Sequence, residues 1–257
     1  MSVTNLELEK IIDTKLNSQA ISDYAPNGLQ VEGKREIQKI ITGVTATLPL
    51  IEQAIEKNAD AILVHHGYFW KSENPCIRGM KGKRIKQLLT NDINLFGYHL
   101  PLDIHPELGN NAQLAKNLGI INLQGLEEKP NSIPMYGEFE TPISAEELAQ
   151  RIQNVLNRKP TLCGDFHSAY PQKLIKTIGI CTGGGQGYID LAASKGLDAF
   201  ISGEISEQTT HSAREQGIYY FACGHHATER DGIKTLGEWL AREYGLDVEF
   251  IDIDNPA

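Results

Sequence analysis

Cysteine is scarce in this 257-residue chain, and the few thiols are scattered. No two of them form a Cys-x-x-Cys pair, and no export signal accompanies them, so we interpret them as reduced core thiols rather than as a disulfide framework. The residues in question are Cys76, Cys163, Cys181 and Cys223. The first residues lack a basic stretch followed by an apolar core, which argues against a signal peptide. No apolar run approaches the roughly 18 residues of a membrane helix. A cytoplasmic protein is expected.

Basic residues are also fewer than acidic ones, 24 against 33. The formal net charge is −9, which disfavours a broad nucleic-acid-binding surface. One local basic cluster stands out, and we interpret it as a solvated helix face; it contains Lys71, Arg78, Lys81, Lys83, Arg84 and Lys86. With 40% apolar and 22% charged residues, the composition is that of an ordinary globular protein, long enough for one large α/β domain or two lobes.

Histidine, by contrast, is concentrated at informative places. His65 and His66 close the apolar run 60–64, and two later segments, 98–103 and 224–229, add further imidazoles and carboxylates. This mixture suits a divalent transition metal without any thiolate. Neighbouring strand residues point to opposite faces, so His65 and His66 share a centre only if the strand ends there, or each holds a different ion. We favour a two-metal site, although most single histidines are ordinary surface or core residues.

Equal spacing strengthens the metal hypothesis. Three residues separate His99 from Asp103, and three separate His225 from Glu229. Pro101 argues against a simple helix over the first spacing, so we expect both segments to be loops at strand ends.

The chain also contains an internal repeat. Residues 40–66 resemble residues 178–204 at an offset of 138, with Asp60 over Asp198 and His65-His66 over Gly203-Glu204. Both copies have the pattern strand, turn, helix and strand, which predicts parallel sheets with right-handed crossovers. The fold class expected is α/β, with internally duplicated βαβαβ lobes, mainly parallel sheets and a metal cleft between the lobes. Functional groups gather beyond the carboxyl ends of parallel strands, where all the candidate ligands lie.

The predicted elements follow from this repeat. Lobe one is expected to span 1–125, with 226–257 packing back on it, and lobe two 126–225, with a linker or small subdomain at 126–165. Strands are predicted near 38–44, 61–65, 93–98, 174–181, 198–202, 218–223 and 247–252. Helices are predicted near 48–58, 80–90, 186–195, 207–216 and 230–243, together with two helices capped by Thr4 with Glu7 and by Ser144 with Glu147. Residues 21–33 are expected to form a turn-rich loop.

Several motifs resemble one known family. The segments HHGYFW at 65–70, YHLPLDIHPELGNN at 98–111, CTGGGQ at 181–186 and GHHATER at 224–230 are similar to those of the Nif-three-like family. The resemblance is closest to its bacterial YbgI-like branch, whose members are often labelled GTP cyclohydrolase type two homologues. It runs from the first helix to the final strand and includes PNGLQVEG at 26–33.

The resemblance implies a duplicated α/β fold, two divalent metal ions per subunit and a ring-shaped homohexamer. By motif, His65 and His225 would bind one ion, His66 and Asp103 the other, and Glu229 would bridge both. Zinc, manganese, iron and nickel are the plausible metals. Five protein ligands for two ions leave positions for water or substrate, as in catalytic sites.

Other residues have open roles. His99 is either a proton-transfer group or hydrogen-bond donor near the metals, or a core histidine. Glu204 either accepts a proton or holds a ligand histidine, and His226 is expected to point away if its segment is extended. The glycine-rich segment 182–187 either holds a phosphate or lets the backbone pack closely against the metal cleft. His105 and His167 are interpreted as loop residues without assigned chemistry.

Three functions remain open from the sequence. The first is a metal-dependent hydrolase for a small polar or phosphorylated, nucleotide-like substrate, with His99 and Glu204 as candidate catalytic residues. The second is a non-catalytic metal-binding or interaction protein that forms a ring. The third, nucleic acid threading the ring, conflicts with the acidic charge unless the lumen of the ring is locally basic. No membrane partner is expected.

Overall fold

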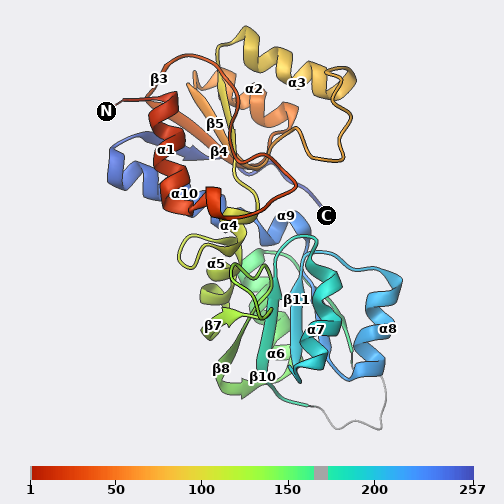
Figure 1. Ribbon diagram of the computed structural model, residues 1–257. Helices are drawn as coiled ribbons and strands as arrows, with labels where there is room; N and C mark the ends of the chain where they lie inside the picture. Colours follow the sequence, from red (N-terminus) through yellow and green to blue (C-terminus); the bar gives the residue numbers. More distant parts are fainter. Residues whose placement is uncertain (1, 165–172) are drawn as a thin grey trace. The chain divides into compact units, whose positions relative to one another are not determined.

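A computed structural model describes residues 2–164 and 173–257, and the chain divides into two compact units (Figure 1). Unit 1 comprises the chain up to Leu108 and Gly232–Asp254, and unit 2 comprises Gly109–Asp231 and Asn255–Ala257. Each unit is built around its own sheet. Among the described residues, no helix combines the length and the apolar composition needed to cross a membrane.

The sheet of unit 1 has five strands in the order β13-β4-β5-β6-β2. All its pairings are parallel except that between β6 and β2. The elements along the chain are β1 (Val3–Thr4), α1 (Asn5–Leu16), η1 (Ser18–Ala20), β2 (Gly28–Val31), β3 (Glu36–Ile37), β4 (Lys39–Thr45), α2 (Leu48–Glu56), β5 (Ala61–His66), α3 (Gly79–Thr90), β6 (Asn94–Gly97), α4 (Leu100–Ile104), α10 (Arg230–Tyr244) and β13 (Asp247–Phe250).

The sheet of unit 2 has six strands in the order β7-β8-β10-β11-β12-β9. Its elements are α5 (Asn110–Leu118), β7 (Ile121–Gly125), β8 (Met135–Ile143), α6 (Ala145–Leu156), β9 (Thr161–Cys163), β10 (Ile175–Cys181), η2 (Gly185–Tyr188), α7 (Ile189–Ser194), β11 (Ala199–Ser202), α8 (Glu207–Gln216), β12 (Tyr219–Ala222) and α9 (His225–Thr228). Here β10, β11 and β12 are parallel, whereas β7, β8 and β9 pair antiparallel. The expected α/β class is confirmed, and the fold is mixed α/β, with the parallel strands of this sheet flanked by antiparallel ones.

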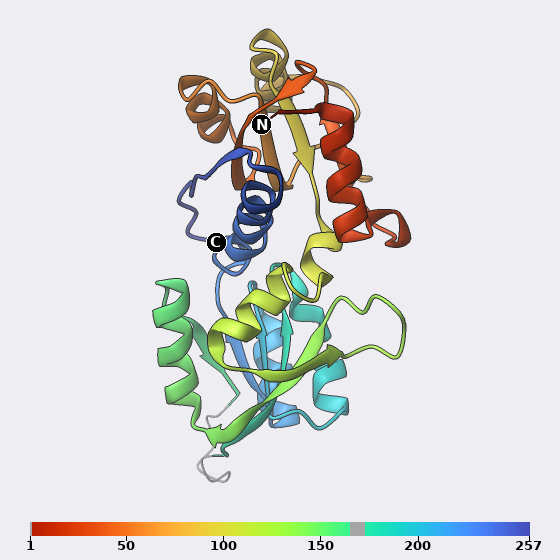
Figure 2. The same ribbon diagram turned by 90° about the vertical axis from the view of Figure 1, so that its left-hand side faces the viewer.

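Strand alternation divides each unit into two cores. In unit 1, Ala61 and Leu63 face the core under α1 and α10, whereas Ile62 and Val64 face the core under α2 and α3. Figure 2 shows α1 and α10 on the same side of the unit 1 sheet. In unit 2, α5 and α6 cover one face of the sheet, and α7 and α8 cover the other. Each unit therefore places its parallel strands between two helical layers.

Most predicted elements have counterparts in these units. The capping box of Thr4 and Glu7 is present at the start of α1, and Ser144 caps α6. The segment 126–165, expected to be a linker or subdomain, instead contributes β8 and β9 to the main sheet through their ladders with β10 and β12. The turn-rich loop 21–33 contains β2, which pairs with β6.

The units are also divided differently from the expected boundary at residue 125. Helix α5 and strand β7 belong to unit 2 because β7 pairs with β8 and because Leu114 and Leu118 of α5 lie in the unit 2 core. At the other end of the chain, the segment that packs on unit 1 begins at Gly232 rather than at residue 226.

Two aspartates make the same contacts in the two units. Asp60 Oδ2 accepts hydrogen bonds from the backbone N–H groups of Gln38 and Lys39 at 2.7 and 2.8 Å. Asp198 Oδ2 accepts them from Lys176 and Thr177 at 3.0 and 2.9 Å. Burial opposes ionisation, but these bonds and a lysine beside each carboxylate lower the pKa of both aspartates. Both carboxylates therefore hold the first strand of a parallel pair at its start.

We expect Asp60→Asn and Asp198→Asn each to lower the free energy of unfolding by about 2 kcal/mol at neutral pH, because each removes a half-buried charge that accepts several hydrogen bonds. A folded pKa below the unfolded value of about 3.9 means that this stability is present above that value and disappears as the pH falls through the folded pKa. Urea unfolding at neutral pH and near pH ~3 measures the effect. Asp247→Asn, at a side chain that is 63% exposed, is the matched control. A loss that is equally large at both pH values would contradict the electrostatic origin.

Candidate metal-binding residues

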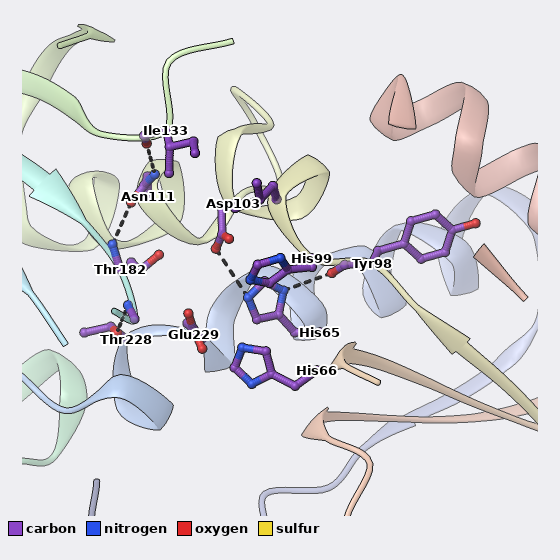
Figure 3. A network of polar contacts seen from close by, with 12 residues as sticks. His65, His66, Tyr98, His99, Asp103, Asn111, Ile133, Thr182, Thr228 and Glu229 are labelled. Atoms are coloured by element: carbon purple, nitrogen blue, oxygen red, sulfur yellow. Dashed lines mark hydrogen bonds and ion pairs between the residues drawn. The ribbon is translucent and has the colours of Figure 1, made fainter. Parts of the chain in front are cut away.

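His65 is a fully buried imidazole at the end of β5. Its Nδ1 lies 2.9 Å from the backbone carbonyl of Tyr98 (Figure 3). Since a carbonyl oxygen only accepts, Nδ1 carries the hydrogen, and in the neutral imidazole Nε2 keeps the lone pair that a metal needs. That Nε2 lies 3.4 Å from Asp103 Oδ1. The neighbouring strand thus fixes the tautomer of His65.

His66 completes β5 and turns toward the same group. Its Nδ1 lies 3.2 Å from Thr45 Oγ1, and Thr45 is its partner in the register of β4 and β5. Adjacent strand residues normally diverge, but β5 ends here, and the rings of His65 and His66 have centroids only 4.5 Å apart. One nitrogen each from His65, His66 and His99 lies within 4.8 Å of the others. The strand end therefore gathers three imidazoles.

Asp103 and His99 lie on a short helix, which corrects the expectation of a loop. His99 is the N-cap of α4, and its carbonyl accepts the N–H groups of Leu102 and Asp103 at 2.8 and 3.2 Å. Pro101 sits in the first turn, where its missing N–H would have no helical partner in any case, so it is tolerated there. The helix turn places Asp103 one turn beyond His99 with its carboxylate nearly buried.

Asp23 is a site residue that the sequence analysis missed. Its Oδ1 lies 2.9 Å from His99 Nδ1, and its Oδ2 accepts the N–H of Leu100 at 2.9 Å. Burial opposes its ionisation, but the hydrogen bonds and charge of His99, with help from Asn27 and Leu100, lower the pKa of Asp23 to about 2. Asn27 Oδ1 accepts the N–H of His99. The only signal in the sequence was the family motif at 26–33, which contains Asn27 but begins after Asp23.

His225 and Glu229 form the corresponding pair in unit 2. Helix α9 begins at His225 and is followed by Glu229, so the segment is helical rather than a loop. His225 Nε2 lies 3.2 Å from Glu229 Oε2, and its Nδ1 lies 2.8 Å from Glu204 Oε1. Burial alone would lower the pKa of His225, but Glu229 and Glu204 raise it to about 9. Without a cation, His225 is therefore protonated at neutral pH, and metal binding must release that proton.

His226 is buried and belongs to the same helix. His226 was expected to point away from His225 if the segment were extended. The segment is helical, so this condition is not met. The backbone N–H of His226 donates to the carbonyl of Ala257. His105 lies just beyond α4, where its Nδ1 accepts the N–H groups of Glu107 and Leu108. His167 lies outside the described residues.

The glycine-rich segment 182–187 packs against the ligands of unit 2. Gly183 has a φ of +63°, and a Cβ at this position would overlap Glu229 Oε1 and lie 3.0 Å from His225 Nε2. The N–H groups of Thr182 and Gly183 donate to Asn111 Oδ1 and Thr228 Oγ1 (Figure 3). These two amides are therefore committed to the protein. Close backbone packing accounts for Gly183 better than phosphate binding does.

The donor atoms fit a divalent transition metal. Unit 1 brings together the imidazoles of His65, His66 and His99 with the carboxylate of Asp103, and unit 2 brings together His225 with Glu204 and Glu229. Neutral imidazole with a hydrogen-bonded Nδ1, beside a carboxylate, is the usual environment of a metal ligand. The fold and these side chains define the class of protein: a mixed α/β protein that carries imidazole and carboxylate groups where its strands end.

Comparison with known proteins identifies the family. A family model for Duf34/NIF3 (NGG1p interacting factor 3) matches residues 3–256. The chain is 71% identical, over 98% of its length and 99% of the relative, to a Pasteurella multocida protein named GTP cyclohydrolase 1 type 2 homolog. The chain belongs to the Duf34/NIF3 family, as the motifs indicated.

Solved structures agree with this assignment. The structure of protein ybgI, described as of unknown function, has a TM-score of 0.93 and 58% identity and covers 99% of this chain and 100% of its own. A crystal structure of a Thermus thermophilus protein has a TM-score of 0.87 and 30% identity over 99% of this chain and 100% of its own. The mixed α/β fold is therefore that of the family.

Proposed function

We propose that this protein holds two divalent metal ions through His65, His66, Asp103, His225 and Glu229 and hydrolyses a small polar or phosphorylated, nucleotide-like substrate. The observation that carries the proposal is the orientation of His65: its Nδ1 is committed to the Tyr98 carbonyl, so its Nε2 lone pair is directed toward the Asp103 carboxylate. A neutral histidine needed only for packing would gain nothing from a carboxylate beside that lone pair.

The connections of the chain support a shared role for the two ligand sets. Asp103 lies six residues before Gly109, where the chain enters unit 2. Glu229 lies three residues before Gly232, where the chain returns to unit 1. Both ligand pairs therefore lie close in the sequence to the segments that connect the two units. Five ligands from both units then give each ion an incomplete protein shell, as in catalytic sites.

The roles of the other polar groups follow from their contacts. When bound, a pair of cations supplies Lewis-acid activation of water and neutralises developing negative charge. Glu204 contacts His225 Nδ1, which favours positioning of that ligand over proton transfer. His99 is the better candidate for proton transfer to or from a substrate, because Asp23 contacts its Nδ1 and one of its ring nitrogens lies within 4.8 Å of a nitrogen of His65 and of His66.

Metal content and turnover test this function. We expect purified protein to carry close to two transition-metal ions per chain, measured by plasma mass spectrometry, with zinc, manganese, iron and nickel as candidates. A screen of nucleotides and phosphoesters should then find a hydrolysed substrate, and His65→Ala should abolish turnover and mainly weaken the ion that His65 shares with His225. The control is His211→Ala, because the His211 side chain is 60% exposed.

The second candidate is a non-catalytic metal-binding or interaction protein. A ring-shaped homohexamer in the cytoplasm is part of either proposal, and light scattering tests the assembly. The basic cluster gives little support to nucleic acid, since Lys81 pairs with Glu73 and lies over the ring of Phe69. Full metal occupancy without turnover of any nucleotide or phosphoester would favour the non-catalytic protein.

A further inference from the structure

An aromatic rim adjoins the histidine group of unit 1. The rings of Tyr24 and Trp70 have centroids 5.7 Å apart, and each packs edge-on against His99 at 4.9 Å. The Trp70 ring also lies 5.9 Å from that of His66. Two large aromatic side chains thus border the imidazoles that, in the proposed function, bind metal or transfer protons.

Tyr24 is exposed although its neighbours are not. Tyr24 is one of the exposed large hydrophobic residues, at 54% of its surface, whereas the side chains of Asp23 and His99 are 3% and 8% exposed. A tyrosine needed only to pack His99 would be expected to bury most of its ring, since burial is what rewards an aromatic side chain in a core. The exposed part of the ring therefore remains accessible to a ligand.

The backbone on either side of the rim is held rigidly. The N–H of Tyr24 donates to Asp23 Oδ1 at 2.7 Å, and its carbonyl accepts the N–H of Lys71 at 2.8 Å. Trp70 Nε1 donates to the Gly67 carbonyl at 3.2 Å. The two loops that carry the aromatic rings are thereby tied to each other, so a ligand would have little ordering to impose.

Backbone strain marks the same place. Phe69, directly before Trp70, has a φ of +64°, which is uncommon for a bulky residue. Glu73 Oε2 accepts the N–H of Phe69 at 2.7 Å and so holds this conformation. Strained residues that surrounding contacts enforce tend to occur at binding and active sites. Here the strain sets the direction of Trp70.

We propose that Tyr24 and Trp70 form a stacking platform for a planar nitrogen heterocycle of the substrate, with the polar part of the substrate directed toward His65, His66 and His99. The inference rests on the proposed function and adds to it the residues that would bind the ring of a nucleotide-like substrate. Aromatic side chains stack on any heterocyclic base because every base has a π face. Tyr24 and Trp70 thus select for a ring, and the histidine group acts on what the ring carries.

Tryptophan fluorescence tests the platform directly, because the chain has only two tryptophans, Trp70 and Trp239. Trp239 packs on Tyr244 in α10, so Trp239→Phe in the metal-loaded protein leaves Trp70 as the sole reporter. With red-edge excitation, a purine nucleoside monophosphate should quench this emission saturably, whereas ribose 5-phosphate should not. Tyr24→Ala should raise the apparent Kd for the nucleotide about tenfold or more, and Tyr244→Ala should leave it unchanged.

Metal content separates this inference from the proposed function. Tyr24→Ala is expected to keep the metal content of the parent protein, and a loss of metal would show that Tyr24 is structural. Equal quenching by ribose 5-phosphate, or no saturable quenching by the nucleotide, would overturn the platform even if phosphoesters without a ring are hydrolysed. Saturable quenching in a protein that binds no metal would leave the platform standing and refute the proposed function.

Discussion

Gly183→Ala is expected to weaken metal binding about 10–100-fold while the fold stays intact. The added methyl group would overlap Glu229 Oε1 and crowd His225 Nε2, and the φ of +63° is unfavourable for alanine. The loop cannot retreat cheaply, because the Gly183 N–H is bonded to Thr228 and its carbonyl accepts the N–H groups of Gly203 and Glu204. The carboxylate must therefore move, and the metal affinity falls with it.

Gly187→Ala is the matched control in the same loop. A Cβ on Gly187 meets nothing within 4 Å, so this variant should bind metal as the parent does. Isothermal titration of metal into stripped protein measures the affinity, and circular dichroism reports the fold. Equal affinities for the two variants would refute the claim that the glycine-rich loop positions Glu229.

Glu229→Gln is expected to reduce the bound metal to less than one ion per chain. The substitution keeps the volume of a side chain that is only 3% exposed but removes its charge. A carboxylate shared by two cations offsets their repulsion, whereas a neutral histidine offsets none of it, so both ions should be lost. His66→Ala should mainly weaken the ion that His66 shares with Asp103.

A second readout of Glu229→Gln needs no metal. Because Glu229 is the first of the two carboxylates that raise the pKa of His225 to about 9, the variant should lower that pKa, as followed by NMR titration of the stripped protein. Glu207→Gln, at a side chain that is 91% exposed, should change neither the pKa nor the metal content. If Glu229→Gln still binds two ions while His66→Ala binds none, the bridging role is wrong.

The parallel strands and their ligand-bearing ends could be predicted from the sequence, because each signal is local. The apolar run before His65 makes a buried strand, and the repeated Asp60 and Asp198 mark equivalent strand starts. Strands β8 and β9 could not be predicted in the same way, because they pair antiparallel with β10 and β12, which lie far along the chain. The helix at Leu100–Ile104 was missed because Pro101 was taken as a helix breaker rather than a first-turn residue.

Part of the candidate site also lay beyond the sequence. Histidines and carboxylates can be recognised as possible metal ligands from the sequence, but their assignment to shared ions remains a prediction. Asp23 could be identified only from its contact with His99 in the structure, because the two residues are far apart in the sequence. Gly183 could not be recognised as a packing residue until the position of Glu229 was known, because the same glycine-rich pattern suits a phosphate loop.

The way unit 1 is assembled from two distant stretches has a consequence for biosynthesis. Helix α10 supplies Ile233, Leu236 and Leu240 to the core shared with α1, and β13 pairs with β4. The ribosome makes α1 and β4 before residues 109–231, and α10 and β13 after them. One face of the unit 1 sheet is therefore covered by α1 alone while all of residues 109–231 is being synthesised. We therefore expect the part of the chain translated first to be the last to reach its native state, the reverse of the usual order in which domains fold during synthesis.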